Sequence, residues 1–310
     1  MSVFINLFVR IVPLYAVILL GFVATRALKV SRESIAKLLI YAIAPVIVFT
    51  GALNAEITPA TMSLPFLFFL AGSVLSLALY SLGKFVFRDS TGNILAFTAG
   101  TGNTGYFGLP VILAVFGDKA LSPAVLATLG LILFENTLGF YLTSRGKHGP
   151  RESLLKIAKL PAIYAFSAGL ALNLAGFDLG GIALAESFLN NFKGTYTVLG
   201  MMMIGMGLAT VRFRHIDFAF IALSFIAKFA LWPALMLLVL FVDANALAIY
   251  PRDARGVLFT LSLVPLAANT VTFAAELDVH PDKAAAAVFL STLFALFYIP
   301  LMTVLFGMTA

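Results

Sequence analysis

Long runs of apolar residues, separated by short polar stretches, dominate the chain. Ten of these runs are about long enough to cross a hydrocarbon core of about 30 Å as helices that rise about 1.5 Å per residue. They cover residues 5–27, 34–53, 63–86, 92–116, 121–144, 160–176, 186–209, 217–242, 255–277 and 283–307. The pattern predicts an all-α membrane protein with ten transmembrane spans, numbered 1 to 10 in chain order.

The composition agrees with this pattern, because 61% of the residues are hydrophobic, 11% are charged and the mean hydropathy is +1.04. Most of the 20 lysines and arginines lie in the loops after odd-numbered spans. An excess of such residues marks cytoplasmic loops, so we expect a multi-pass protein of the cytoplasmic (inner) membrane with both termini outside the cytoplasm. Only Arg10 precedes Arg26 among basic residues, so the first span lacks the basic region of a signal peptide and is expected to be retained.

Five spans followed by five place the two halves of the chain in opposite orientations. We therefore predict a first inverted repeat at 1–145, a short basic cytoplasmic connection at 146–159 and a second repeat at 160–310. The halves also share local sequence, since Glu33-Ser34 opens span 2 and Glu186-Ser187 opens span 7.

Span 4 has a centre that suits a continuous helix poorly. The stretch Gly100–Pro110 holds four glycines, two threonines, an asparagine and a proline, and in a helix interior glycine costs about 1 kcal/mol and proline about 3 kcal/mol relative to alanine. Irregular backbone at membrane depth survives only where it is buried in protein or lines a cavity. We expect span 4 to be two half-helices with a break at 102–105.

Span 9 repeats this feature. Pro265 lies four residues before Asn269-Thr270, and the same Asn-Thr pair occurs in span 4 as Asn103-Thr104. Corresponding interrupted segments in two halves of a transporter point to its binding site. We expect a second break at 265–269 and a crossing of the two broken spans near the midplane of the membrane.

Other classes of protein fit less well. Gly100, Gly102 and Gly105 have the spacing of a dinucleotide fingerprint, but that motif needs a preceding strand and an acidic residue about 20 positions on, whereas the flanks are apolar and the next acid is Asp118. No ATP-binding motif occurs, and the chain has no cysteine, which excludes disulfides and thiolate chemistry. We expect no cofactor, no metal and no nucleic-acid partner.

An intramembrane enzyme would need a nucleophile with a base, or metal ligands, within the spans. No span holds a histidine, and His148, His215 and His280 all fall in predicted cytoplasmic loops. We interpret them as solvated loop residues, with pH sensing as the alternative. No catalytic residue is predicted, and the protein is not expected to be an enzyme.

The sequence Asn103–Pro110 resembles the signature of the auxin efflux carrier family, which includes plant auxin exporters and bacterial permeases such as malonate transporters. Residues 265–270 resemble the matching stretch of that family's second half. The resemblance implies two inverted five-helix repeats with crossed broken helices 4 and 9, and a homodimer. It also implies a scaffold of spans 1, 2, 6 and 7 and a mobile transport domain of spans 3–5 and 8–10. Related folds are those of bile acid symporters and sodium/proton antiporters.

The crossing has the chemistry of an anion site. The N-termini of the second half-helices carry partial positive charge, and asparagine amides can donate to a carboxylate, although asparagine also caps helices. The resemblance favours direct contact, because family members bind a carboxylate through the crossover asparagines. The predicted substrate-binding residues are Asn103, Thr104, Gly105, Tyr106, Pro110, Pro265, Asn269 and Thr270.

This chain departs from the family in two places. Plant relatives place an acidic residue and a lysine on span 3, but here that span offers only Ser73, Ser76, Tyr80 and Lys84, which argues against auxin as the substrate. Span 9 lacks the carboxylate that sodium-coupled relatives use, since Glu276 lies past the break, so sodium coupling has little support.

Three ionisable residues lie within spans, at a cost of about 2.5–3.5 kcal/mol each near a helix centre. Glu135 in span 5 and Lys228 in span 8 lie at matched depth, and our hypothesis is that they form an ion pair, direct or through one water. In the competing hypothesis Glu135 is a proton carrier that faces the substrate cavity. Lys193 in span 7 either extends to the headgroups or attracts anions toward the site.

These observations predict a secondary transporter that moves a small organic anion, a mono- or dicarboxylate, by an elevator-like mechanism, with membrane lipid as its surroundings. The alternatives are a membrane-embedded carboxylate sensor and an exporter of auxin-like aromatic acids. The glycine- and methionine-rich stretch Gly200–Gly207 is interpreted as a helix-packing face, with a dimer face as the alternative.

Overall fold

The computed structural model describes residues 3–145, 161–177, 183–209 and 217–307, and within these residues every regular element is a helix. The all-α prediction is therefore confirmed for the described chain. The predicted connection at 146–159, together with His148 and His215, lies outside the described residues.

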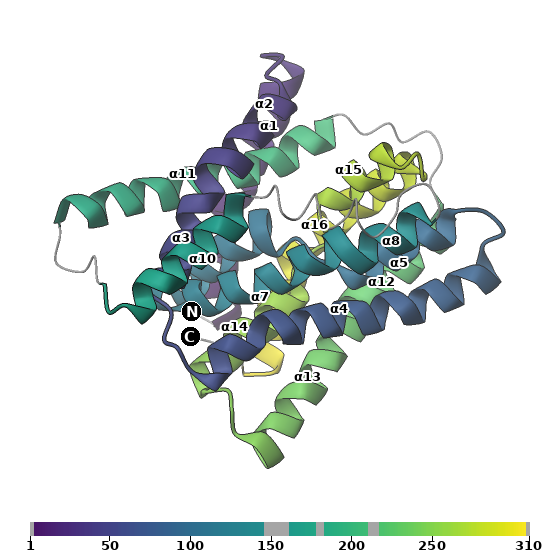
Figure 1. Ribbon diagram of the computed structural model, residues 1–310. Helices are drawn as coiled ribbons and strands as arrows, with labels where there is room; N and C mark the ends of the chain where they lie inside the picture. Colours follow the sequence, from purple (N-terminus) through teal and green to yellow (C-terminus); the bar gives the residue numbers. More distant parts are fainter. Residues whose placement is uncertain (1–2, 146–160, 178–182, 210–216, 308–310) are drawn as a thin grey trace.

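The first half of the chain is drawn from purple to teal in Figure 1. Its helices are α1 (Val3–Arg26), α2 (Arg32–Leu38), η1 (Leu39–Ile43), α3 (Ala44–Leu53), α4 (Pro59–Val86), α5 (Thr91–Gly100), η2 (Thr104–Gly108), α6 (Leu109–Phe116), η3 (Asp118–Ala120), α7 (Leu121–Phe134), η4 (Glu135–Gly139) and α8 (Phe140–Ser144). The short element η3 is a 3₁₀ helix, and the other η elements are π-helical turns within longer helices.

The second half continues from green to yellow. Its helices are α10 (Pro161–Leu174), α11 (Ala183–Ala209), α12 (Phe218–Ile226), the π-helical η5 (Ala227–Leu231), α13 (Trp232–Val242), the π-helical η6 (Asp243–Leu247), α14 (Arg252–Leu263), α15 (Asn269–Glu276) and α16 (Pro281–Leu305).

Six stretches of the described chain are long and apolar enough to cross a membrane. They are Phe4–Arg26, Arg32–Leu53, Pro59–Val86, Asp118–Ser144, Phe218–Leu247 and Pro281–Leu305, and they coincide with predicted spans 1, 2, 3, 5, 8 and 10. Predicted spans 4 and 9 are the interrupted helices α5–α6 and α14–α15. Predicted span 6 is the short helix α10, and span 7 is α11, whose first half carries Asn190, Asn191 and Lys193. The ten-span inverted repeat stays a prediction.

The helices pack in two groups. In one group α1 lies along α11 and α3 lies along α10, and these helices occupy the left of Figure 1. In the other group α4 packs on α5 and α7, and α16 packs on α12, α14 and α15. Contacts of α1 with α16 and of α3 with α7 join the groups. The predicted division into a scaffold and a mobile transport domain, and any movement between them, stays a prediction.

The contact between α1 and α11 depends on two glycines. A Cβ added to Gly205 would lie 1.7 Å from the Ile18 carbonyl oxygen, and one added to Gly21 would lie 2.1 Å from the Met202 carbonyl oxygen. Because the two backbones touch, any larger residue would push the helices apart. The interpretation of Gly200–Gly207 as a helix-packing face is therefore confirmed at Gly205, and a dimer face on this stretch stays untested.

Candidate functional site

The two interrupted helices meet at their breaks. α5 ends at Gly100 and η2 begins at Thr104, while α14 ends at Leu263 and α15 begins at Asn269. The predicted breaks at 102–105 and 265–269 are therefore confirmed to within about two residues. The Asn103 N–H donates to the Pro265 carbonyl oxygen over 2.8 Å, so the breaks touch each other.

Local sequence explains where the helices stop. Val264 is extended, with φ −60° and ψ 152°, because a following proline disfavours helical backbone in the residue before it. The freed backbone groups are then satisfied from other helices: the Trp232 indole N–H donates to the Ala99 carbonyl oxygen over 2.7 Å, and the Leu266 N–H donates to the Ser291 hydroxyl over 3.2 Å. Both residues are absent from the sequence predictions, although Trp232 is the single tryptophan of the chain.

The Asn103 side chain does not cap a helix. It precedes η2 and makes no side-chain cap bond, and its Nδ2 is buried with no hydrogen-bond partner in the described structure. The capping interpretation is therefore wrong for this asparagine. Thr270 is also fully buried, and its Oγ1 likewise has no partner within the described part of the chain. Buried polar atoms without partners are rare, so both atoms are available to a ligand.

Glu135 connects the two breaks. Its side chain is 5% exposed, one carboxylate oxygen accepts from the Thr101 hydroxyl, and the other accepts from Asn269 Nδ2 over 3.1 Å. Asn269 is the first residue of α15, so the carboxylate lies where the partial positive charge of a helix N-terminus favours an anion. The direct ion pair expected with Lys228 is not formed; Glu135 bonds to the crossover instead.

Lys228 lies in the π-helical turn η5 and contacts the break of span 4. Its side chain is completely buried, and its Nζ has no hydrogen-bond partner among the described residues. The ammonium lies 4.7 Å from the centroid of the Trp232 ring, a cation–π contact. A Cβ added to Gly102 would lie 2.4 Å from Nζ, so the lysine reaches the break only because residue 102 is glycine.

The remaining predicted residues of span 4 surround this centre. Thr104 is buried, and Pro110 is buried in the first turn of α6. Tyr106 is half-buried, and its ring lies 6.4 Å from that of Tyr196 on α11. A Cβ on Gly105 would lie 3.3 Å from the Tyr196 hydroxyl oxygen. This side of the crossover therefore faces the other group of helices.

Lys193 lies away from the crossover. Its Nζ forms an ion pair with Asp118 over 3.1 Å, and its side chain is 19% exposed. The pair joins α11 to the turn η3 that follows span 4. The sequence interpretation considered only the headgroups or a free anion as partners of Lys193 and missed this carboxylate, because the sequence does not place span 7 beside that turn.

Within the described residues, no three histidine, aspartate or glutamate side chains come together as metal ligands. The crossover brings together a buried ammonium, an amide and a hydroxyl that have no partner among the described residues, and a carboxylate that already occupies one donor.

Comparison with known proteins agrees with a membrane transporter. Residues 6–152 match the model of the family described as membrane transport protein. An uncharacterized transporter of Methanocaldococcus jannaschii is 29% identical over 244 residues, which cover 77% of this chain and 77% of the relative. An uncharacterized transporter of Methanothermobacter thermautotrophicus is 28% identical over 207 residues, which cover 65% of this chain and 64% of the relative.

Proposed function

We propose that this protein, whose residues 6–152 match the model of the family described as membrane transport protein, is a secondary transporter that moves a small organic anion, a mono- or dicarboxylate, across the cytoplasmic membrane. The observation that carries the proposal is the buried ammonium of Lys228, which lies against the break of span 4 with no hydrogen-bond partner in the described structure. Leaving a charge in such a place is costly unless a counter-ion visits it.

The substrate carboxylate binds between Lys228 and Asn103. The ammonium supplies the charge, and Nδ2 of Asn103, which has no partner among the described residues and lies one residue after Gly102, supplies a neutral donor. A hydrogen bond to a charged group is worth about 1.5–3 kcal/mol, so two donors to the carboxylate give useful affinity while permitting release. Thr270 adds a hydroxyl from the second break.

Glu135 controls the second asparagine. In the present arrangement its carboxylate accepts from Asn269 Nδ2, so that donor is occupied. Protonation of Glu135 weakens this bond, because a carboxylate accepts more strongly than a carboxylic acid, and Asn269 then becomes free to bind the substrate. This gives the competing hypothesis, in which Glu135 is the proton carrier, a physical route to proton coupling.

Alternating access follows from movement of one group of helices against the other. Among the described residues, few polar contacts join the groups: Lys193 pairs with Asp118, Arg10 Nη1 donates to the Val115 carbonyl oxygen over 3.0 Å, and the Tyr15 hydroxyl donates to the Thr292 carbonyl oxygen over 2.5 Å. The first two contacts lie at the end of span 4 predicted to face outward. We propose an elevator-like movement that breaks them, in a homodimer held through the group containing α1 and α11.

Counterflow in proteoliposomes tests this function. A thermal-shift screen of mono- and dicarboxylates first selects a ligand, and vesicles preloaded with that ligand should then accumulate the labelled compound, whereas empty vesicles should not. Lys228→Met should abolish accumulation. A carboxylate sensor would bind the ligand without accumulating it, and binding with no counterflow would overturn the transport proposal.

A further inference from the structure

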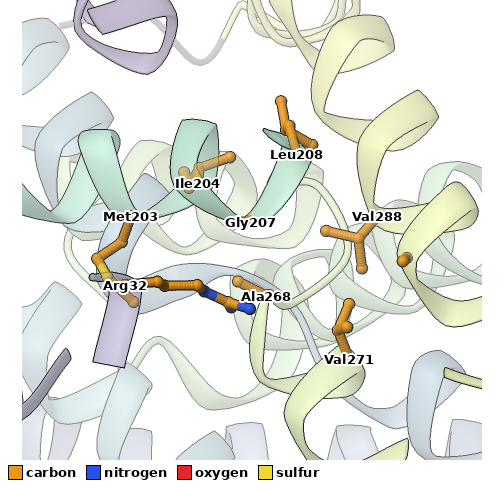
Figure 2. A pocket seen from close by; sticks show the side chains of 9 residues that line it. Arg32, Met203, Ile204, Gly207, Leu208, Ala268, Val271 and Val288 are labelled. Carbon is orange, nitrogen blue, oxygen red and sulfur yellow. The ribbon is translucent and has the colours of Figure 1, made fainter. Parts of the chain in front are cut away.

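A second feature with a positive charge lies beside the crossover. A small pocket, part of it open to solvent, lies between the start of α2, the end of α11 and the adjoining parts of α15 and α16. Figure 2 shows the Arg32 side chain extending across it toward Ala268, with Leu208, Val271 and Val288 on the remaining sides. Apart from the guanidinium, these lining side chains are apolar.

Arg32 has a free guanidinium in this pocket. The residue is half-buried, and no hydrogen bond or ion pair of Arg32 occurs among the described residues. A Cβ added to Gly207 would lie 3.5 Å from the guanidinium carbon, so the small residue at 207 leaves room beside the charge. Arg32 lies between predicted spans 1 and 2, in a loop whose basic residues mark it as cytoplasmic.

The pocket reaches the crossover from the end predicted to face the cytoplasm. Ala268, which lines it, directly precedes Asn269, the crossover residue bound to Glu135. An anion in the pocket would therefore lie next to Ala268, one residue from a donor of the crossover. The contacts of Lys193 and Arg10 lie at the end of span 4 predicted to face the other side of the membrane.

We propose that the Arg32 pocket is an anion-recognition site for carboxylates with a short aliphatic body. Arginine suits this role because its planar guanidinium can form two parallel bonds to one carboxylate and loses less hydration than an ammonium. The apolar sides select ligands that have methylene groups to bury. The proposal deepens the transport function, on which it rests for the identity of the ligand: the pocket holds the anion as it enters or leaves the crossover.

Site-directed labelling tests the pocket without any transport measurement. Because the chain has no cysteine, Leu208→Cys places a single thiol on the pocket wall. The protein is held in nanodiscs of phosphatidylcholine, which removes anionic lipid, and the thiol reacts with a negatively charged and a positively charged methanethiosulfonate of similar size. We expect Arg32→Gln to lower the ratio of the rate with the negative reagent to the rate with the positive reagent about ten-fold. This change is at the lower end of the range by which a focused charge alters encounter rates.

Two controls, a second probe position and a competing ligand belong to this experiment. Arg26→Gln removes an exposed arginine at the end of α1 and should leave the ratio of the labelling rates unchanged. Arg32→Gln should also leave that ratio unchanged when the thiol is placed by Asn245→Cys, at an exposed position on η6. If Leu208→Cys does not fold, Val271→Cys probes the same pocket from α15. Butyrate should slow labelling in the parent background and not in Arg32→Gln.

The outcomes separate the two proposals. The pocket proposal would be overturned if Arg32→Gln changed the ratio of the labelling rates no more than Arg26→Gln does. It would also be overturned if butyrate failed to slow labelling. If the thiol is protected only when phosphatidylglycerol is added to the nanodiscs, the site binds a lipid headgroup. That result would also overturn the proposal. Because neither labelling nor protection requires movement of solute, failure of counterflow alone leaves the result for the pocket intact.

Discussion

Two lysines in the second half of the chain, the half-buried Lys283 and the buried Lys228, have opposite surroundings. Lys283, at the start of α16, lies 2.7 Å from Asp217 Oδ2, 2.8 Å from the Thr91 hydroxyl oxygen and 3.9 Å from Asp89 Oδ2. Lys228, in the π-helical turn η5, has a ring face beside it and no hydrogen-bond partner in the described structure. One ammonium is saturated with acceptors, and the other is left open.

The difference separates a structural lysine from a binding lysine. The Lys283 cluster ties α16 to α12 and to the start of α5, and Asp217 also accepts from the Phe220 N–H over 3.0 Å as the cap of α12. Every charge there has a partner within the protein. At the crossover the protein instead bears the cost of an unpartnered charge and an unpartnered Asn103 amide, which favours a site completed by a ligand.

The largest expected effect is that of Lys228→Met. Removing the charged partner of a desolvated anion costs about 2–5 kcal/mol, so carboxylate affinity should fall by at least about 30-fold. The thermal stability of the ligand-free protein should stay the same or rise, because the substitution removes a buried charge that has no acceptor. Binding titrations and melting curves on one preparation measure both. Unchanged affinity would contradict the assignment of Lys228 to the site.

The two crossover asparagines should respond differently to alanine. Asn103→Ala and Asn269→Ala should each weaken carboxylate binding by roughly 10- to 150-fold, the equivalent of about 1.5–3 kcal/mol for a donor to a charged group. Only Asn269→Ala should also lower stability, since it removes a donor from the buried Glu135. If both variants bind as the parent does, the asparagines have no role in recognition.

Lys283→Met should have the opposite signature to Lys228→Met. It removes hydrogen bonds between charged or polar groups in the cluster with Asp217 and Thr91, so the free energy of unfolding should fall by about 2 kcal/mol. Carboxylate affinity at the crossover should stay within about two-fold of the parent, because Lys283 contacts Thr91 at the first residue of α5, whereas the break follows the last residue of that helix. A large loss of affinity with unchanged stability would reverse the comparison of the two lysines.

The smallest expected effect is a change in how steeply stability falls at low pH. Burial raises the pKa of the Asp217 carboxyl, but the hydrogen bonds from Lys283 and the Phe220 N–H outweigh burial and hold this pKa below its ordinary value. The pKa of Asp89 is also lowered, because hydrogen bonds from Thr91 outweigh the effect of burial. A carboxyl whose pKa is lowered in the folded state stabilises the protein above its unfolded pKa of about 3.9 and loses that stability as pH falls through the folded pKa. Melting temperatures below pH 4 should fall less steeply in Asp217→Asn than in the parent.

Much of the site is predictable from sequence because it rests on local signals. Glycine and proline within apolar runs located both breaks, and the repeated Asn-Thr pair matched the two halves. The depth of Glu135 and Lys228 followed from counting along their spans. Their partners did not, because the direction in which a side chain points depends on packing and on the π-helical turns η4 and η5, for which the residues gave no signal.

The missed residues share one property. Each contacts helices that are distant from it in the chain, as is the case for Arg32, Trp232 and Ser291. The sequence around each of them resembles ordinary loop or span sequence. Arg32 is the clearest case, since its charge fits the cytoplasmic bias of basic residues equally well with or without a pocket. Only the packing of α2 against α11, which brings Arg32 into a pocket shared with residues of α15 and α16, gives it a place near the crossover.

The fluorescence of Trp232 tests the central claim most directly. It is the single tryptophan of the chain, and the Lys228 ammonium lies over its ring, so a carboxylate that binds at the crossover must change its emission. The account predicts a saturable change on titration with the selected carboxylate, retained in Lys283→Met and lost in Lys228→Met. A saturable change with the same midpoint in Lys228→Met as in the parent would contradict the claim that this lysine and the break beside it form the anion site.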